Sequence, residues 1–220
     1  MLSALFPEVC PGCGGSTDAG FCAICAAGFP AVAQPCPGCG LARPVIGCPR
    51  RTAVWSVEVV VAPLRYGVPL DHYVQALKYN GARKLGRTLG LLLADRLGAH
   101  AVQIDALVPV PLHPRRLRER GYNQAAEIAR SVSRRLRIPL LARGIRRSRA
   151  SPPQTGLDAQ SRYANMASAF AVARDLRGLR LAIVDDVITT GATVNALAGA
   201  LAAAGADRLE AWAVARTLPD

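Results

Sequence analysis

The second part of the chain alternates between two patterns of apolar positions. Four short runs rich in β-branched and other apolar residues predict buried strands: "VEVVVAPLRY", "DALVPVPL", "LRLAIVDD" and "RLEAWAVART". Helical spacing predicts helices between these runs, over 70–80, 83–98, about 123–136 and "ATVNALAGALAAAGA". A short helix and a strand at "SAFAV" are expected after an arginine-rich loop. Strands that alternate with helices predict an α/β fold, with a parallel sheet covered by helices on both faces.

The strand predicted within "LAIVDDVITTGAT" (residues 181–193) ends in two adjacent acids, Asp185 and Asp186, and a loop of threonines and glycine follows. Ligands of such sheets bind at the carboxyl ends of the strands. A helix that starts near Thr193 offers a phosphate its free N–H groups and the positive end of its dipole. The two carboxylates can accept hydrogen bonds from vicinal hydroxyls or hold a hydrated magnesium ion. A sugar phosphate fits this combination.

A purely structural role, in which the two acids cap the turn before the helix, is the alternative. Two neighbouring carboxylates repel each other, and a buried charge without a partner is costly, so the pair favours a ligand. The stretch is not a dinucleotide-binding glycine fingerprint, and the chain contains no GxxxxGK[ST] phosphate loop. Nucleotide sites of these two types are therefore excluded here.

All seven cysteines lie between Cys10 and Cys48, which marks a boundary in composition near residue 50. This segment contains a repeat, "CPGCGGSTDAGFCAIC" followed by "CPGCGLARPVIGCPRR". The repeat aligns the cysteines of the first copy with those of the second, the fourth of which is replaced: Cys10, Cys13, Cys22 and Cys25 with Cys36, Cys39, Cys48 and Arg51. We expect two domains, residues 1–52 and residues 53–220.

Paired CxxC knuckles typically give zinc a closed set of thiolates. Disulfides are disfavoured in the cytosol, and a redox CxxC would not explain the duplication. We predict a zinc ribbon on the first copy, with a structural or partner-binding role, because so small a ribbon owes its folding to the metal. The three cysteines of the second copy are further candidate ligands. An arrangement in which Cys10 and Cys13 pair with Cys36 and Cys39 stays open on spacing alone.

Length and charge narrow the class of protein. The 220 residues are 51% hydrophobic, enough for a substantial core, and no apolar run approaches the ~20 residues of a membrane span. The start "MLSALFPEVC" lacks the features of a signal peptide, so a soluble cytoplasmic protein is expected. The formal charge is +12, and twelve arginines lie between Arg115 and Arg149. Guanidinium groups bind phosphates well, so the cluster indicates a phosphate-containing ligand. For any single arginine, a solvated position on the surface is the simpler interpretation.

The stretch "VDDVITTGAT" resembles the phosphoribosyl diphosphate (PRPP) motif of type I phosphoribosyltransferases. The resemblance implies a type I phosphoribosyltransferase fold, with Asp185 and Asp186 on the ribose hydroxyls. It also implies a loop that holds the 5′-phosphate, formed by Thr189, Thr190, Gly191, Ala192 and Thr193. PRPP with Mg²⁺ is the implied ligand.

Further stretches make the chain similar to the ComF family, which includes competence proteins used in DNA uptake. They are "LVPVPLHPRRLRERGYNQA", "PPQTGLDAQSRYANMASAF" and the cysteine-rich start. The resemblance implies a diphosphate loop at Leu112, His113, Pro114 and Arg115, with Arg118, Arg120 and Asn123 as nearby candidates. It further implies a closing loop over 146–163 and a hood over residues 53–82. Lys78 is a candidate phosphate contact, and Arg51 weakens the case for a second zinc ion.

Two functions stay open at this point. The first is a magnesium-dependent phosphoribosyltransferase whose acceptor the sequence does not name. The second is an accessory protein on the same fold that binds single-stranded DNA or the DNA-uptake machinery, for which the arginine cluster argues. A phosphoribosyl site retained in a DNA-uptake factor would satisfy both.

Overall fold

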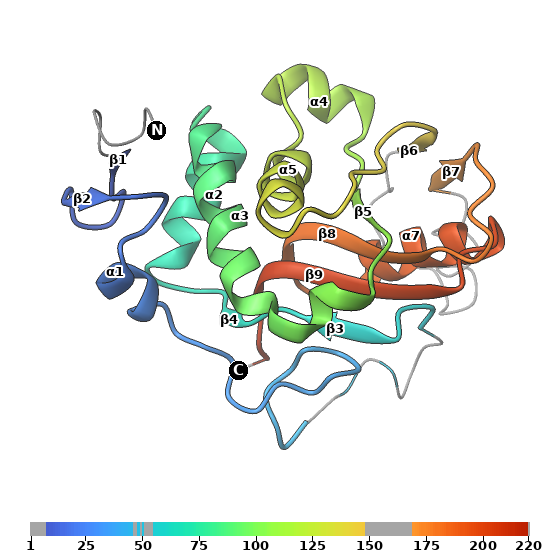
Figure 1. Cartoon of the computed structure of the whole chain (residues 1–220), viewed down its shortest axis with the longest axis horizontal. Coiled ribbons are helices and arrows are strands. Elements are labelled where there is room, and N and C mark those ends of the chain that lie inside the picture. Colours follow the sequence, from blue (N-terminus) through green and yellow to red (C-terminus); the bar gives the residue numbers. More distant parts are fainter. Residues whose placement is uncertain (1–7, 46–47, 49, 51–54, 148–168, 220) are drawn as a thin grey trace, which may run out of the picture.

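The computed structural model describes residues 8–45, 48, 50, 55–147 and 169–219 (Figure 1). Its centre is a sheet of five strands in the order β3-β9-β8-β5, with β4 also paired to β9. Every pairing in this sheet is parallel, which confirms the predicted parallel sheet. The strands are β3 Val59–Val61, β4 Leu64–Arg65, β5 Ala106–Pro109, β8 Arg180–Ile188 and β9 Arg208–Arg216.

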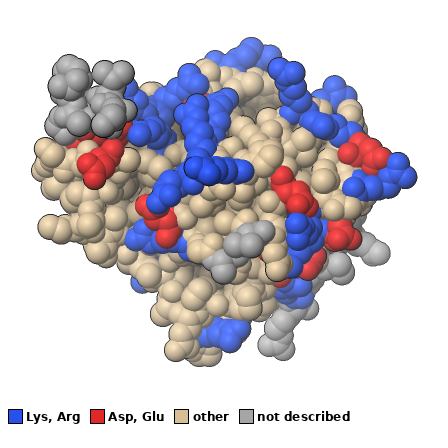
Figure 2. Space-filling model, viewed as in Figure 1, with Lys and Arg blue, Asp and Glu red and all other residues tan. Residues whose placement is uncertain are grey.

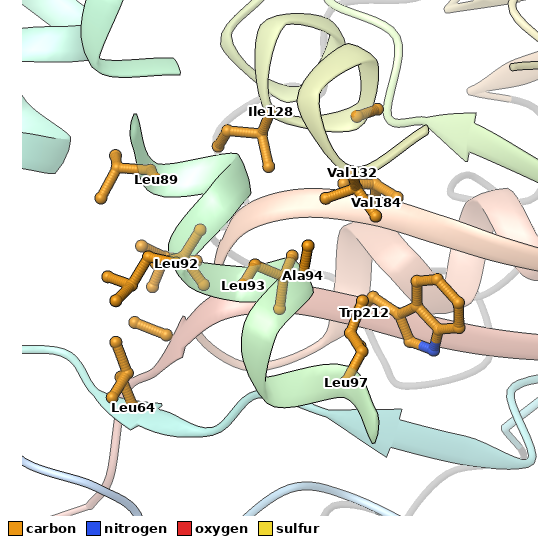
Figure 3. Close-up of a cluster of buried hydrophobic side chains, with 14 of the residues drawn as sticks. Leu64, Leu89, Leu92, Leu93, Ala94, Leu97, Ile128, Val132, Val184 and Trp212 are labelled. Carbon is orange, nitrogen blue, oxygen red and sulfur yellow. The ribbon is translucent and has the colours of Figure 1, made fainter. Parts of the chain in front are cut away.

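Helices cover both faces of the sheet, as the alternating pattern predicts (Figure 1). One face packs against α2, α3 and α5, and the other against α7. The bounds of these helices are α2 Leu70–Tyr79, α3 Lys84–Leu97, α5 Gln124–Leu136 and α7 Ala192–Ala203. Figure 3 shows the first face, where side chains of α3 and α5 meet Val184 of β8 and Trp212 of β9. No helix in the described residues is long and apolar enough to cross a bilayer.

Two glycines let α3 and α5 approach closely. A Cβ atom on Gly86 would lie 2.4 Å from Cβ of Glu127, and one on Gly90 would lie 2.5 Å from Cβ of Ser131 and 2.6 Å from the carbonyl oxygen of Ile128. The Ser131 hydroxyl donates to the carbonyl oxygen of Arg87, 2.9 Å away. The packing of the core on this face therefore depends on the absence of side chains at both glycines.

The cysteine-rich segment packs on the same core. Its elements are β1 Glu8–Val9, β2 Ser16–Thr17 and α1 Ala23–Ala27, drawn in blue beside α2 in Figure 1. Phe21 and Phe29 make edge-to-face contacts with each other and with Tyr73 of α2, at centroid distances of 4.8, 4.9 and 5.9 Å. The Arg96 guanidinium donates to the carbonyl oxygen of Ala26, 2.6 Å away. The segment is thus fastened to the helices next to it.

The structure differs from the sequence-based elements at three places. Strand β8 continues past the two acids to Ile188, where the strand was expected to end at Asp186. Pro114 and Arg115, predicted as part of a loop, belong to helix α4 (Pro114–Arg120). A 3-10 helix over Gly98–Gln103 (η2), which the sequence did not predict, follows α3. The expected strand at "SAFAV" is β7 Phe170–Val172, paired antiparallel with β6 Ile145–Arg147 outside the main sheet. The expected short helix before it lies outside the described residues.

Replacing Gly90 with alanine tests the close approach of α3 and α5. We expect Gly90→Ala to lower the free energy of unfolding by about 1–3 kcal/mol, because the new methyl group overlaps Ser131 and the Ile128 carbonyl. Gly199→Ala, in α7, is the matched control: its Cβ would meet nothing closer than the Ser56 hydroxyl at 3.8 Å. That variant should gain about 0.5–1 kcal/mol from helix propensity. Urea unfolding measures both; an unchanged Gly90→Ala protein would contradict the packing described.

Candidate functional site

The two acids predicted as ligands lie on β8, between β5 and β9, near its carboxyl end. Neighbouring residues of a strand point to opposite faces of the sheet. Ile183 belongs to the core on the α7 side and Val184 to the core on the side of α2, α3 and α5. Asp186 lies on the side of Val184, where Lys78 of α2 contacts it.

Asp186 is buried and held by a lysine from another element. Its Oδ1 atom lies 2.9 Å from Nζ of Lys78, in the last turn of α2, and accepts the N–H of Val187 at 2.7 Å. Burial alone would lower the pKa of Lys78, but the attraction of Asp186 and Asp185 outweighs it and raises that pKa. The other oxygen of Asp186, Oδ2, is buried and has no hydrogen-bond partner among the residues that the structure describes.

Asp185 is a carboxyl group whose ionised form is disfavoured. Burial and the charge of Asp186 raise its pKa to about 8, against the smaller opposing effects of the Asp186 N–H, Lys78 and Arg147. Its Oδ1 accepts the N–H of Asp186 at 2.9 Å. Arg147, at the end of β6, is close enough to Asp185 for its positive charge to oppose this rise in pKa. The Arg147 guanidinium lies 5.5 Å from the ring centre of Phe170.

The loop after β8 leads directly into α7. Thr189 and Thr190 are exposed, and Gly191 adopts the left-handed conformation with φ of 84° before the helix begins at Ala192. The Thr190 hydroxyl oxygen accepts the N–H of Ala192 at 3.3 Å. The sequence placed these residues beside a helix N-terminus, and the structure brings them there, with the helix starting one residue earlier than Thr193.

A buried arginine holds the start of this loop. Arg216, at the end of β9, is 2% exposed, and its guanidinium donates to four carbonyl groups. Nε reaches the carbonyl oxygen of Cys39 at 2.9 Å, and Nη1 reaches those of Ile188 at 2.9 Å, Thr217 at 3.2 Å and Thr189. One side chain therefore joins the second cysteine knuckle to the loop after β8.

The far end of the loop meets the segment that follows the cysteine repeat. A Cβ atom on Gly191 would lie 2.2 Å from the indole ring of Trp55, so the ring rests on the glycine backbone. The N–H of Ser56 donates to Oδ1 of Asn195 at 2.8 Å, one helical turn further along α7. Gly191 is thus required both by its φ angle and by the contact with Trp55.

The predicted diphosphate loop follows β5, but part of it is helical. Leu112 and His113 are half-buried, and Nδ1 of His113 accepts the N–H of Arg115 at 3.3 Å, which caps α4. The Arg115 side chain is paired with Glu119 at 2.9 Å and is 78% exposed. Asn123 caps α5 by accepting the N–H groups of Ala125 and Ala126. These contacts give His113 and Asn123 structural roles at helix ends.

The first four cysteines form a cluster suited to a metal ion. The sulfur atoms of Cys10, Cys13, Cys22 and Cys25 all lie within 4.8 Å of one another, and those of Cys13 and Cys22 are 3.8 Å apart. A tetrahedral zinc ion with Zn–S bonds of about 2.3 Å needs sulfurs about 3.8 Å apart, so the four thiols fit zinc. The N–H of Cys22 donates to the sulfur of Cys10 at 3.3 Å and lowers the pKa of that thiol to about 6.

This cluster decides the question that spacing left open. Cys10 and Cys13 group with Cys22 and Cys25 of their own copy, so the interleaved arrangement with Cys36 and Cys39 is wrong. Within the described part of the chain, Cys36, Cys39 and Cys48 belong to no cluster of three or more potential ligands. Their role as metal ligands stays a prediction, and Arg51, which replaces the fourth cysteine, lies outside the described residues.

Similarity to known proteins extends over most of the chain. Residues 123–218 match the phosphoribosyl transferase domain family. Competence protein F of Haemophilus influenzae is 32% identical over 204 residues, which cover 89% of this chain and 84% of the relative. DNA utilization protein YhgH of Escherichia coli K12 is 33% identical over 209 residues, covering 90% of this chain and 91% of the relative. The chain belongs to the ComF family. This confirms the resemblance seen in the sequence, together with a phosphoribosyltransferase-type fold.

Solved structures similar to this ComF-family chain have lower identity. A purine phosphoribosyltransferase from Pyrococcus horikoshii is 21% identical, with a TM-score of 0.37 over 60% of this chain and 72% of that one. The protein TT1426 from Thermus thermophilus is 18% identical, with a TM-score of 0.37 over 61% of this chain and 84% of that one. The family assignment rests on the sequence relatives.

Three residues near the site of this ComF-family protein were not singled out by the sequence. Arg147 faces Asp185, Arg216 holds the loop, and Trp55 lies on Gly191. Each comes from an element far from the motif in the chain. The sequence did contain a signal for Arg216, which ends the apolar run "LEAWAVAR" of a predicted buried strand. An arginine in such a position needs hydrogen-bond partners.

The raised pKa of Asp185 predicts a pH-dependent stability. An unfolded aspartate has a pKa of about 3.9, so between that value and about 8 the folded chain binds the additional proton. The free energy of unfolding contributed by this group therefore falls as pH rises through that window. Asp185→Asn should match the parent near pH 4 and exceed its Tm by several degrees at pH 8, since 1 kcal/mol is worth about 2–4 °C in a chain of this size.

Asp105→Asn is the control for that measurement. Asp105 pairs with Arg180 at 2.9 Å, and hydrogen bonds from Arg180 lower its pKa to about 2. Its stabilising effect is present above the unfolded pKa and is lost as pH falls, so this variant should melt below the parent at pH 8. Thermal melts of the parent, Asp185→Asn and Asp105→Asn across pH show whether the two Tm differences from the parent have opposite signs at pH 8. A Tm difference for Asp185→Asn that does not grow with pH would contradict the placement of Asp185.

Proposed function

We propose that this protein binds PRPP at the carboxyl end of β8, with Asp185 and Asp186 on the ribose hydroxyls and residues 189–193 around the 5′-phosphate. The observation that carries this proposal is Oδ2 of Asp186, a buried carboxylate oxygen with no hydrogen-bond partner in the described residues. A buried acceptor left unpaired costs about 1–3 kcal/mol. A sugar hydroxyl that donates to this oxygen would remove that cost.

The rest of the site supports a phosphorylated sugar. Gly191 and the N-terminus of α7 present backbone N–H groups beside two exposed threonine hydroxyls, which suits a phosphate monoester. Lys78 and Arg147 both bring positive charge near the acids. The acids and these cations together match a ligand that carries both vicinal hydroxyls and phosphate groups.

We further propose that PRPP binds with Mg²⁺ and that the protein is a phosphoribosyltransferase. Mg²⁺ favours oxygen ligands and supplies charge that balances the diphosphate. In the transfer, the bond between the anomeric carbon and the diphosphate oxygen breaks while an acceptor attacks that carbon. The contribution of this chain is to orient the ribose through Asp185 and Asp186 and to hold the phosphate. The stretch 146–163, predicted to close over the site, lies largely outside the described residues.

A second candidate function is binding of single-stranded DNA in DNA uptake. Two relatives are named Competence protein F and DNA utilization protein. Lys and Arg side chains gather on the upper part of the face in Figure 2, where Figure 1 places α4. Arg116 and Arg118 of α4 are exposed and make no ion pair among the described residues. Such a surface suits DNA phosphates.

The double variant Asp185→Asn with Asp186→Asn tests the PRPP site. Replacing both carboxyl groups should weaken PRPP binding at least about 30-fold, since a hydrogen bond to the charged Asp186 contributes about 1.5–3 kcal/mol and one to the largely protonated Asp185 about 0.5–1.5 kcal/mol. Calorimetry with PRPP and Mg²⁺ measures the affinity. Asp105→Asn, which removes an acid at the opposite end of β5 and β8, should bind PRPP like the parent.

The same double variant separates the two candidate functions. DNA binding through the arginines of α4 should survive the loss of the acids and should weaken steeply as salt rises. Unchanged PRPP affinity in the double variant would refute the donor site. Binding of an oligothymidylate that is absent, or that does not respond to salt, would refute the second candidate.

We also propose that the cluster of Cys10, Cys13, Cys22 and Cys25 binds one structural zinc ion. The donor chemistry and the sulfur distances support it. Phe21, between the two knuckles, packs on Tyr73 of α2, so a folded ribbon supports the helix that carries Lys78. The division into a zinc ribbon of residues 1–52 and a phosphoribosyltransferase-like domain of residues 53–220 is part of this proposal.

Metal analysis of two cysteine variants tests the zinc site. Cys13→Ser should lose about one zinc ion per chain and melt at a lower temperature, because the metal contributes folding energy. Cys48→Ser, in the second copy, should keep the zinc of the first cluster. A parent protein that holds clearly less than one zinc ion per chain, or a Cys13→Ser variant with unchanged zinc content, would contradict the proposal.

A further inference from the structure

A pocket of about 500 Å³ lies beside the acid pair, between the end of α2 and helix α4. Its volume falls in the usual range for small-molecule sites, about 300–1,000 Å³. Lys78 lines the pocket and also contacts Asp186, so the pocket adjoins the proposed ribose site. The other side chains used below that line it are Tyr79, Arg116, Glu119, Arg120 and Tyr122.

The charges of this pocket do not balance. Lys78 is paired with Asp186, and Glu119 is paired with Arg115 at 2.9 Å. Arg116 and Arg120 have no acidic partner in the described part of the chain. Arg120 donates to the neutral amide of Gln124 at 3.1 Å. Two guanidinium groups therefore face the pocket with their charge uncompensated, which favours an anionic ligand.

The walls of the pocket are flat. Tyr79 is 71% exposed, and the guanidinium of Arg120 lies over its ring at 5.0 Å from the centroid. Tyr122 is largely buried beside the pocket, and its hydroxyl already donates to the carbonyl oxygen of Leu77, so that hydroxyl is satisfied within the protein. Aromatic and guanidinium planes bind other planar groups well. Phosphate groups make no use of such walls, so the pocket suits a ring better than a diphosphate.

From these contacts we infer that the pocket holds the acceptor of the transfer and selects a planar heteroaromatic ring that carries a carboxylate. Arg116 and Arg120 bind the carboxylate, and Tyr79 and Tyr122 flank the ring. The inference rests on the proposed function. In the transfer, a ring nitrogen supplies the electron pair of the new N–C bond, and the diphosphate leaves with the electron pair of the broken C–O bond. Where the attacking nitrogen carries a proton, as in orotate, that proton passes to the departing diphosphate, whereas a pyridine nitrogen, as in nicotinate, has none to lose and becomes a pyridinium.

Two pairs of probes that differ by one charge test this inference. Orotate and uracil share one ring, as nicotinate and nicotinamide share another, and in each pair the first carries a carboxylate. In calorimetry on the full chain, at least one carboxylate should bind at least tenfold more tightly than its neutral counterpart. Arg116→Gln and Arg120→Gln should each weaken that binding at least tenfold, and Arg116→Gln should leave PRPP affinity within about threefold. Arg134→Gln, at an exposed arginine of α5 outside the pocket, is the control and should bind both ligands like the parent.

The other outcomes overturn the inference in distinguishable ways. If neither carboxylate binds to a protein that still binds PRPP, the acceptor class is wrong while the proposed function stands. If the Arg116 and Arg120 variants lose PRPP and keep the carboxylate, the pocket holds the diphosphate instead. If an oligothymidylate displaces the carboxylate when its phosphate groups are at the same concentration as the carboxylate, the pocket is part of a DNA-binding surface. Loss of PRPP binding in the parent would refute the proposed function itself.

Discussion

Two adjacent carboxylates near the end of a buried central strand are the constraint around which this structure is arranged. A carboxylate removed from water must be protonated, paired with a cation or supplied with hydrogen-bond donors. Asp186 is paired with Lys78 from α2, and Asp185 lies near Arg147 from β6. The compensation is incomplete, because one oxygen of Asp186 has no partner among the described residues and the pKa of Asp185 is raised to about 8. Such incomplete compensation is the expected state of a site prepared for a ligand.

The loop that follows the acids is held at both ends by parts of the chain that lie outside the motif. Arg216 binds the carbonyl groups of Ile188 and Thr189, and Trp55 rests on Gly191. The same guanidinium binds the carbonyl oxygen of Cys39. The cysteine-rich segment therefore contacts the site twice, through Arg216 at the loop and through Tyr73 on the helix that carries Lys78. The segment therefore supports the site and also carries the cluster of four cysteines.

The proposed PRPP site and the pocket beside it share Lys78, and their chemistry differs. The acids and the N-terminus of α7 suit hydroxyl and phosphate groups, whereas the pocket combines an exposed tyrosine ring with arginines that have no acidic partner among the described residues. The arginines of helix α4 have different surroundings. Arg116 and Arg120 line the pocket, whereas Arg115 does not line it and pairs with Glu119, which does. Arg115, which the family resemblance singled out, does not line the pocket, whereas its neighbour Arg116 does.

The sequence by itself determined the features that depend on local spacing. Periodicities of two and 3.6 residues located the strands of the parallel sheet and four helices, and the spacing of CxxC pairs located the cluster of four cysteines. The run of two acids and a Thr-Gly loop marked the end of the central strand. Helix α4 was missed because six of its seven residues are proline or charged, so it shows no apolar stripe.

Only the tertiary structure decided which distant residues complete the site. The partners of the acids, the carbonyl groups around Arg216 and the ring on Gly191 depend on the order of strands in the sheet and on helix packing across it. The sequence around each residue does not reveal these partners, because the contacts form between elements that come together only when the core is buried. The local sequence therefore marks where the two acids and the Thr-Gly loop lie, and packing determines the charges and surfaces around them.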